Sequence, residues 1–221
     1  MKIKNTTVLK SVEKPGRYSA GEFGQIIKDK KDIKARWAFC FPDTYEIGMS
    51  NLGVRILYGA LNSEPDIWCE RAYAPWTDMQ EQMRKHGIPL TAHESGDPLR
   101  EFDIIGITLQ YEMCYTTTLQ MLSLAGIPLY AKDRGEDLPI IIGGGPCAYN
   151  PEPIADFFDC FSIGEGEENL VEFTRLYIEM KENGTYTKKD FLHRAAAEIG
   201  GIYVPSLYDV KYNADGTIES Y

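Results

Sequence analysis

Residues 42–53 combine carboxylate, phenol, hydroxyl and amide side chains with two glycines. Groups of these kinds hydrogen-bond to polar ligands or satisfy the free backbone amides at the start of a helix. A strand-to-helix connection normally takes about two to six residues, and a longer one is often functional. Capping of the next helix by Asp43 or Ser50 would explain part of the pattern. We expect ligand contacts from Asp43, Tyr45, Glu46, Gly48, Ser50 and Asn51.

Three shorter segments, residues 108–112, 143–150 and 164–168, add further glycines and polar groups. Glycine has no Cβ, so a ligand can approach its backbone closely and its φ angle can be positive. Taken alone, a glycine triplet also forms ordinary tight turns, and glutamates at a helix N-terminus are stabilised by the helix dipole. The candidates for ligand contact in these segments are Thr108, Gln110, Tyr111, Glu112, Gly143, Gly144, Gly145, Asn150, Gly164, Glu165 and Gly166.

Other kinds of site find no support in the residue spacing. His86, His93 and His193 stand apart, without the spacing of a metal cluster, and solvated side chains are the simpler interpretation. The glycine run does not continue into the Gly-Lys-Ser/Thr of a phosphate-binding loop, and no Gly-x-Gly-x-x-Gly follows the first apolar run. We predict neither catalytic side chains nor metal ligands.

Short apolar runs alternate with segments of helical periodicity from residue 36 onward, which is typical of a parallel α/β sheet. Such a sheet binds ligands beyond the carboxyl ends of its strands, where the strand order reverses, so the four candidate segments should converge at one edge. The predicted fold is α/β, a doubly wound five-stranded parallel sheet of flavodoxin-like (Rossmann-like) order. We predict strands at 37–41, 67–73, 103–109, 139–142 and 160–163, with helices beginning near Leu52, Thr77, Tyr115 and Glu165.

The pattern divides the chain into three regions. Residues 1–35 are polar and rich in lysine, and we interpret them as a leader that packs on the domain. Residues 36–183 form the α/β domain itself. Residues 184–221 are more weakly patterned and include a hairpin turn at 213–216. We interpret this last region as the start of a linker or next domain that continues beyond Tyr221.

Composition narrows the partners and the compartment. The 23 basic and 33 acidic side chains give a net charge of −10, which opposes binding to a nucleic-acid backbone. No apolar stretch approaches the roughly 20 residues that span a bilayer, and no signal peptide follows Met1. The five cysteines are widely spaced and odd in number, as expected for free thiols in a reducing compartment. We expect a cytoplasmic protein that binds neither nucleic acid nor membrane.

Three motifs in the candidate loops match a known family. Residues 42–53 read Pro-Asp-x-Tyr-Glu-x-Gly-Met-Ser-Asn-Leu-Gly, residues 144–153 read Gly-Gly-Pro-x-x-x-Asn-Pro-Glu-Pro, and residues 164–167 read Gly-Glu-Gly-Glu. With them, residues 14–178 resemble the N-terminal cobalamin (B12)-binding region of an uncharacterised family of B12-binding radical SAM proteins. The resemblance implies a Rossmann-like cobalamin-binding fold in which the candidate loops hold a corrinoid.

One residue of the first motif departs from cobalamin domains at large. Those domains place Asp-x-His-x-x-Gly after the first strand, whereas this chain has Asp43, Tyr45 and Gly48 at these positions. The resemblance therefore implies a cobalamin held without a protein histidine on cobalt. An unperturbed tyrosine loses its proton only near pH ~10, and a protonated phenol ligates reduced cobalt poorly. We expect Tyr45 to pack against the corrin face instead.

The resemblance also implies cofactors that this chain cannot hold. Radical SAM enzymes bind a [4Fe-4S] cluster on Cys-x3-Cys-x2-Cys, and no two cysteines here lie so close together. The cluster and S-adenosylmethionine are thus implied beyond Tyr221, in a downstream radical SAM domain of the same polypeptide. On this interpretation the chain is a module of an enzyme and is not active alone.

Two other interpretations share the architecture, because a fold does not fix a function. A flavodoxin-like or receiver domain would bind a small ligand at the same edge. A receiver, however, needs an acidic cluster and a phosphoacceptor aspartate where this chain has Asp43 and residues 110–112. The remaining alternative is a structural module that binds no ligand.

Overall fold

A six-stranded sheet forms the centre of the molecule in the computed structural model, which describes residues 1–220. The strand order is β2-β1-β3-β4-β5-β6, and the first five strands are parallel. The strand order therefore reverses between β1 and β3, which confirms the predicted doubly wound sheet of flavodoxin-like order. The strands are β1 (Ala35–Phe41), β2 (Ile67–Tyr73), β3 (Ile104–Thr108), β4 (Ile140–Gly144), β5 (Cys160–Ser162) and β6 (Ile202–Tyr203).

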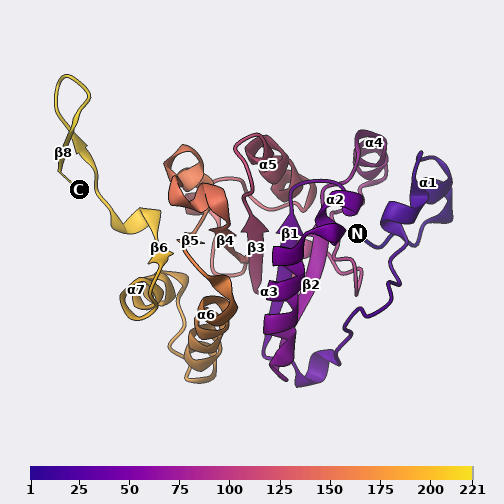
Figure 1. The fold of residues 1–221 in the computed structure, drawn as a ribbon, viewed down its shortest axis with the longest axis horizontal. Helices are drawn as coiled ribbons and strands as arrows, with labels where there is room; N and C mark the ends of the chain where they lie inside the picture. The colour runs from indigo at the N-terminus through magenta and orange to yellow at the C-terminus, as the bar shows by residue number, and fades with distance from the viewer. Residues whose placement is uncertain (221) are drawn as a thin grey trace.

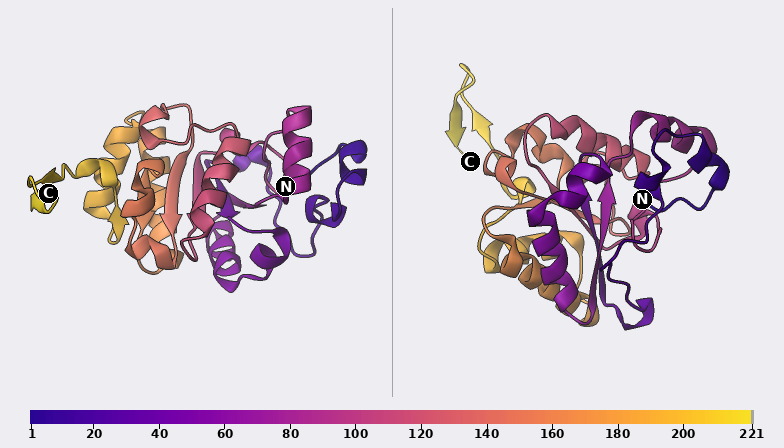
Figure 2. Two further views of the ribbon diagram at one scale, coloured as in Figure 1. Left: turned by 90° about the horizontal axis from the view of Figure 1, so that it is seen from above. Right: turned by 45° about the vertical axis from the view of Figure 1, so that its right-hand side comes forward.

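Helices cover both faces of this sheet (Figure 1, Figure 2). Helices α4 and α5 pack on one face through a core that includes Met83 and Met121. Helices α3, α6 and α7 pack on the other face through Leu61, Phe173 and Phe191. Because both faces are covered, β3 and β4 are almost wholly apolar. The helices are α2 (Tyr45–Ser50), α3 (Leu52–Ser63), α4 (Thr77–His86), α5 (Cys114–Leu124), α6 (Gly166–Glu182) and α7 (Lys188–Glu198).

The leader packs along the β2 edge of the sheet. Its helix α1 (Thr6–Lys10) and the buried side chains of Met1 and Ile3 join the core on the α4 side. Further along, Lys28 donates from Nζ to the carbonyl of Asn62 at 2.9 Å, where α3 ends. Short 3-10 helices lie at Pro15–Tyr18, Lys30–Asp32, Leu99–Glu101, Ala131–Asp133, Pro146–Tyr149, Glu152–Phe157 and Pro205–Leu207.

A sixth strand in the central sheet was not predicted. β6 pairs antiparallel with β5, with Tyr203 opposite Phe161, and two residues are too few to show a periodic pattern. Beyond β6, strands β7 (Lys211–Tyr212) and β8 (Ile218–Ser220) form a hairpin that projects from the body of the molecule (Figure 1). Within residues 1–220, no helix combines the length and the apolar character needed to cross a membrane.

Candidate functional site

A cavity of about 220 Å³ opens between α3 and α6. Residues of β1, β3, β4 and β5 line it, so it lies beside the point where the strand order reverses. Open parallel sheets bind ligands at this place because the connections there diverge to opposite faces and leave a crevice. The cavity is therefore the candidate site that the topology favours.

Apolar side chains of the sheet form the inner wall of the cavity. Trp37 and Phe39 come from β1, and Ile142 comes from β4. Trp37 is completely buried, and its Nε1 donates to Oγ1 of Thr174 in α6 at 2.8 Å. This hydrogen bond fixes the indole between the sheet and α6. Apolar walls with few polar groups suit a planar, largely apolar part of a ligand.

The three consecutive glycines after β4 have different roles. A Cβ on Gly143 would lie 2.7 Å from Cδ1 of Phe161, so Gly143 is required for packing between strands. Gly145 has a φ of 93°, a conformation that favours glycine. A Cβ on Gly144 would meet only the carbonyl oxygen of Ser162, at 3.8 Å, and Gly144 lines the cavity. Of the three, Gly144 is therefore the position whose missing side chain leaves space for a ligand.

The candidates from the three later loops largely converge on this cavity. Thr108 accepts a hydrogen bond from Nε2 of Gln110, so these two side chains hold each other. Where α6 begins, a Cβ on Gly166 would lie 3.0 Å from Cδ2 of Leu57, which shows how closely α3 and α6 approach. The sequence candidates that line the cavity are Thr108, Gln110, Gly143, Gly144, Gly145, Gly164, Glu165 and Gly166.

Residues 42–52 of the first candidate loop lie outside the cavity lining. It forms the short helix α2, and a Cβ on Gly48 would lie 2.5 Å from Cδ1 of Tyr73, so this glycine lets α2 rest on the β2 edge. Asn51 caps α3, because its Oδ1 accepts from the backbone N–H of Val54 at 3.0 Å. Ser50 donates to a carbonyl of α2 at 2.9 Å. These residues position the start of α3, which does line the cavity.

The other candidates also lie outside the lining, and their contact with a ligand stays a prediction. Asp43 accepts from the next backbone N–H at 2.6 Å. Glu46 is half-exposed and pairs with Nε of Arg17 at 2.8 Å and with Nζ of Lys14 at 3.7 Å. Exposed side chains on connections at the same edge of the sheet are those of Tyr111, Glu112 and Asn150.

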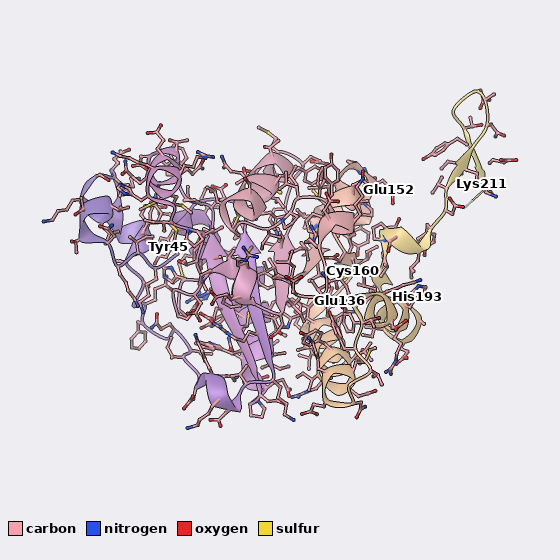
Figure 3. All side chains as sticks on the ribbon, turned by 180° about the vertical axis from the view of Figure 1, so that it is seen from behind. Tyr45, Glu136, Glu152, Cys160, His193 and Lys211 are labelled. Atoms are coloured by element: carbon pink, nitrogen blue, oxygen red, sulfur yellow. The ribbon has the colours of Figure 1, made fainter. Side chains whose placement is uncertain are left out.

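Tyr45 belongs to a cluster of rings and is absent from the cavity lining. Its ring stacks on His93, with centroids 5.4 Å apart, and meets Tyr73 edge-on at 5.4 Å. Burial, followed by the neighbouring Glu22, raises the pKa of Tyr45 to about 12. The phenol therefore keeps its proton at neutral pH. Figure 3 shows Tyr45 well apart from Cys160 of β5.

A buried charged cluster adjoins the Tyr45 ring. Arg71 of β2 places Nε 2.7 Å from Oε1 of Glu94 and Nη2 2.9 Å from Oε2 of Glu22. His93 places Nε2 2.8 Å from Oε1 of the same Glu22. The leader therefore contributes the carboxylate that joins Arg71 to His93.

The interpretation of every histidine as solvated is wrong for His93. Its exposed fraction is 1%, whereas His86 and His193 are exposed as expected. His93 follows α4 on a segment whose backbone bonds to β2, since its N–H donates to the Arg71 carbonyl at 2.7 Å. Only the tertiary fold brings the leader over this segment, so residue spacing gave no signal of the burial.

Glu22 should make stability depend on acidic pH. Burial alone would raise its pKa, but His93, Tyr45 and Arg71 hold the pKa of Glu22 at about 2, below its ordinary 4.5. A lowered folded-state pKa stabilises the fold above pH 4.5, and this stabilisation is lost as the pH falls towards 2. We expect wild type to have a higher free energy of unfolding than Glu22→Gln at pH 6. This difference should shrink as the pH falls from 4.5 towards 2. Urea unfolding at several pH values measures it, and a pH-independent difference would contradict the ionised, paired carboxylate.

Several lining residues were missed from the sequence because they look like ordinary core residues. Trp37, Phe39, Ile142 and Leu170 are apolar and lie on strands or helices, so their periodicity indicates burial and nothing more. Gly53 stands in the first motif and was not selected as a contact. Its position at the start of α3 could have indicated a contact, because the missing side chain of Gly53 leaves the cavity open there.

Together, the fold and the cavity define a class of protein, an open α/β domain with a cavity at its switch point. Residues 53–205 match the family model described as radical SAM proteins, N-terminal, and the chain belongs to this family. It is similar to the uncharacterized protein MJ0966 of Methanocaldococcus jannaschii, with 29% identity over 154 residues. That alignment covers 68% of this chain and 28% of the relative, so the chain corresponds to a minor part of that protein's length. No solved structure matches the chain.

Proposed function

We propose that this chain is the cobalamin-binding N-terminal module of a radical SAM enzyme. The observation that carries the proposal is the glycine-bordered, apolar cavity at the switch point of the sheet. When bound, cobalamin supplies a cobalt centre for transfer of a group or an electron. The chain's own residues would bind and orient the cofactor.

The cavity has the size for one part of a corrinoid. Sites that enclose a whole drug-sized ligand measure about 300–1,000 Å³, and a cavity of about 220 Å³ is smaller. The cavity would then hold a planar arm of the cofactor between α3 and α6, and the larger corrin ring would lie outside it. The nucleotide tail with its benzimidazole is such an arm, and Trp37 and Gly144 would face it.

Exposed apolar side chains around the same edge support a ring above the cavity. Leu52 is 67% exposed, Met113 82% and Tyr149 72%, and they lie on the connections that leave β1, β3 and β4. Exposed apolar side chains on these connections would suit contact with an apolar ring. The exposed carboxylates of Glu165 and Glu167 at the cavity would repel the dianionic phosphate of a flavin mononucleotide more strongly than the singly charged phosphodiester of the cobalamin tail.

The geometry of Tyr45 predicts the state of cobalt. Its protonated phenol is held by His93, Tyr73 and Glu22 outside the cavity lining, so it cannot act as a ligand at neutral pH. If the benzimidazole occupies the cavity, it has left the cobalt as well. Bound cobalamin should therefore carry neither a histidine nor its own benzimidazole on cobalt.

Anaerobic titration with cob(II)alamin, followed by desalting and electron paramagnetic resonance, tests the proposal. We expect the corrinoid to stay with the protein and each cobalt line to lack the triplet splitting that an axial nitrogen produces. Tyr45→Phe should give the same spectrum, because its role is packing. A triplet in the bound complex would contradict this axial arrangement. If no corrinoid is retained at millimolar concentration, a module without a ligand is the better assignment.

The rest of the proposed enzyme lies in other parts of the polypeptide. The five cysteines are buried on β1, β2, α5, β5 and the segment after β4, too dispersed to hold one cluster. We propose that a [4Fe-4S] cluster and S-adenosylmethionine belong to a radical SAM domain that partners this module. The cobalamin module itself would extend to about Val204, because α7 and β6 pack on the sheet.

A further inference from the structure

We propose that the leader forms a latch, residues 17–26, that sets the position of α2, and that Glu22 is its positioning residue. Glu22 is nearly buried and pairs with Arg71 at 2.9 Å and with His93 at 2.8 Å. The Tyr45 ring of α2 stacks on the same His93, with centroids 5.4 Å apart, and Glu22 contributes to the raised pKa of Tyr45. Glu22 thus joins the latch to β2 and to the segment after α4, and the His93 ring connects it to Tyr45 of α2.

The backbone of the latch gives it no independent stability. Residues 19–29 contain no helix or strand, and Ala20, Gly21 and Gly24 all have positive φ angles of 57°, 87° and 78°. A left-handed conformation at alanine persists only when surrounding contacts impose it. Side chains therefore hold the latch in place, and Ile26 adds a backbone N–H that donates to the Tyr58 hydroxyl at 2.7 Å.

Helix α2 depends on such external contacts as well. It has six residues, far fewer than an isolated helix needs, and its N-cap Thr44 makes no side-chain capping bond. Its anchors are Gly48 on Tyr73, the Tyr45 ring in the cluster, and Glu46. Arg17 of the latch places Nε 2.8 Å from Oε2 of Glu46. The latch therefore contacts α2 at Glu46 as well as through the Tyr45 cluster.

The latch is connected to the cavity by the continuous chain from α2 into α3. Helix α2 leads directly into Asn51, which caps α3, and the first turn of α3 provides Gly53 and Val54 of the cavity wall. Releasing the latch should loosen α2 and this first turn while leaving the distant α6 wall unchanged. An effect of the latch on corrinoid affinity rests on the proposed function, whereas its effect on the position of α2 does not.

Hydrogen exchange on the ligand-free full chain tests the latch without any cofactor. We expect Glu22→Gln to speed amide exchange in residues 44–52 by at least about tenfold, with α6 unchanged. Phe23→Ser is the matched control, because the neighbouring Phe23 is fully exposed, and it should exchange like wild type. Glu46→Gln removes the ion pair with Arg17 and should speed amide exchange in residues 44–52 to a smaller extent.

A spectroscopic readout separates positioning from general loss of structure. Since Glu22 contributes to the raised pKa of Tyr45, Glu22→Gln should lower that pKa in an NMR titration of the Tyr45 ring. Unchanged exchange in residues 44–52, or equal acceleration in α6, would overturn the latch. Faster α2 exchange together with weaker cob(II)alamin binding supports both proposals. Faster α2 exchange in a protein whose wild type binds no corrinoid supports the latch and refutes the proposed function.

Discussion

Gly144→Val should weaken cob(II)alamin binding by at least about 100-fold, which corresponds to roughly 2.7 kcal/mol, while the protein stays folded. Gly144 lines the cavity, and a Cβ there meets only one backbone oxygen at 3.8 Å. Its φ angle is not in the left-handed region, so valine adopts this backbone without strain. The added methyl groups therefore enter the space that the ligand needs. Equilibrium titration gives the affinity, and urea unfolding gives the stability.

Gly143→Val is the matched control one residue earlier. Its Cβ would lie 2.7 Å from Cδ1 of Phe161 and 3.1 Å from Cδ1 of Phe158, so the core must shift. Overpacking of this kind costs about 1–3 kcal/mol, and we expect the loss in the free energy of unfolding. If Gly144→Val bound cob(II)alamin as wild type does, the ligand would not occupy this cavity. If it unfolded like Gly143→Val, its glycine would serve the turn alone.

Asp159→Ala should lower the free energy of unfolding by about 3–5 kcal/mol at pH 7. The Arg134 side chain is completely buried, and its Nη2 lies 3.1 Å from Oδ2 of Asp159. The same Oδ2 accepts from the backbone N–H of Ile141 at 2.7 Å, where β4 begins. Removing the carboxylate leaves a buried guanidinium charge without its partner. Because small domains are stable by only about 5–15 kcal/mol, this is a large fraction of the total.

Two variants test the physical reason for that loss. Adding Arg134→Met to Asp159→Ala removes the unpaired charge, and we expect it to restore part of the stability. Glu198→Ala breaks an exposed pair with Arg194, whose Nε lies 2.7 Å from Oε1 of Glu198. Exposed pairs contribute about 0–1 kcal/mol, so this change should be small. A cost below about 1 kcal/mol for Asp159→Ala in thermal or urea unfolding would refute the buried-charge argument.

The architecture could be predicted from the sequence because its signal is local. Apolar runs such as residues 104–107 and 140–142 alternate with helical periodicity, and Gly87 marks the end of α4. These patterns follow from burial on both faces of a sheet. β6 was not predicted as a strand of the central sheet, because two residues are too few to show a periodic pattern. Its place in the sheet depends on pairing with β5.

Half of the candidate site was also determined locally. Parallel sheets bind ligands at the carboxyl edge of their strands, and this rule predicts a site at the loops with Thr108, Gly144 and Gly164. All three residues line the cavity. The first motif shows the limit of the same reasoning. Six of its residues were candidates, yet Asn51 caps α3 and Gly48 packs on Tyr73.

Only the tertiary structure decided which side chains meet across long stretches of sequence. Glu22, Arg71 and His93 are far apart in the chain, and no spacing rule joins a leader carboxylate to a strand arginine and a loop histidine. The buried Trp37 likewise forms a cavity wall where α6 packs on the sheet, and its indole nitrogen donates to Thr174 of that helix. Local sequence determines where strands, helices and turns form, because propensity and burial act over a few residues. The partners of a buried charge or ring depend on how the leader, sheet and helices pack together, and this information lies in no single segment.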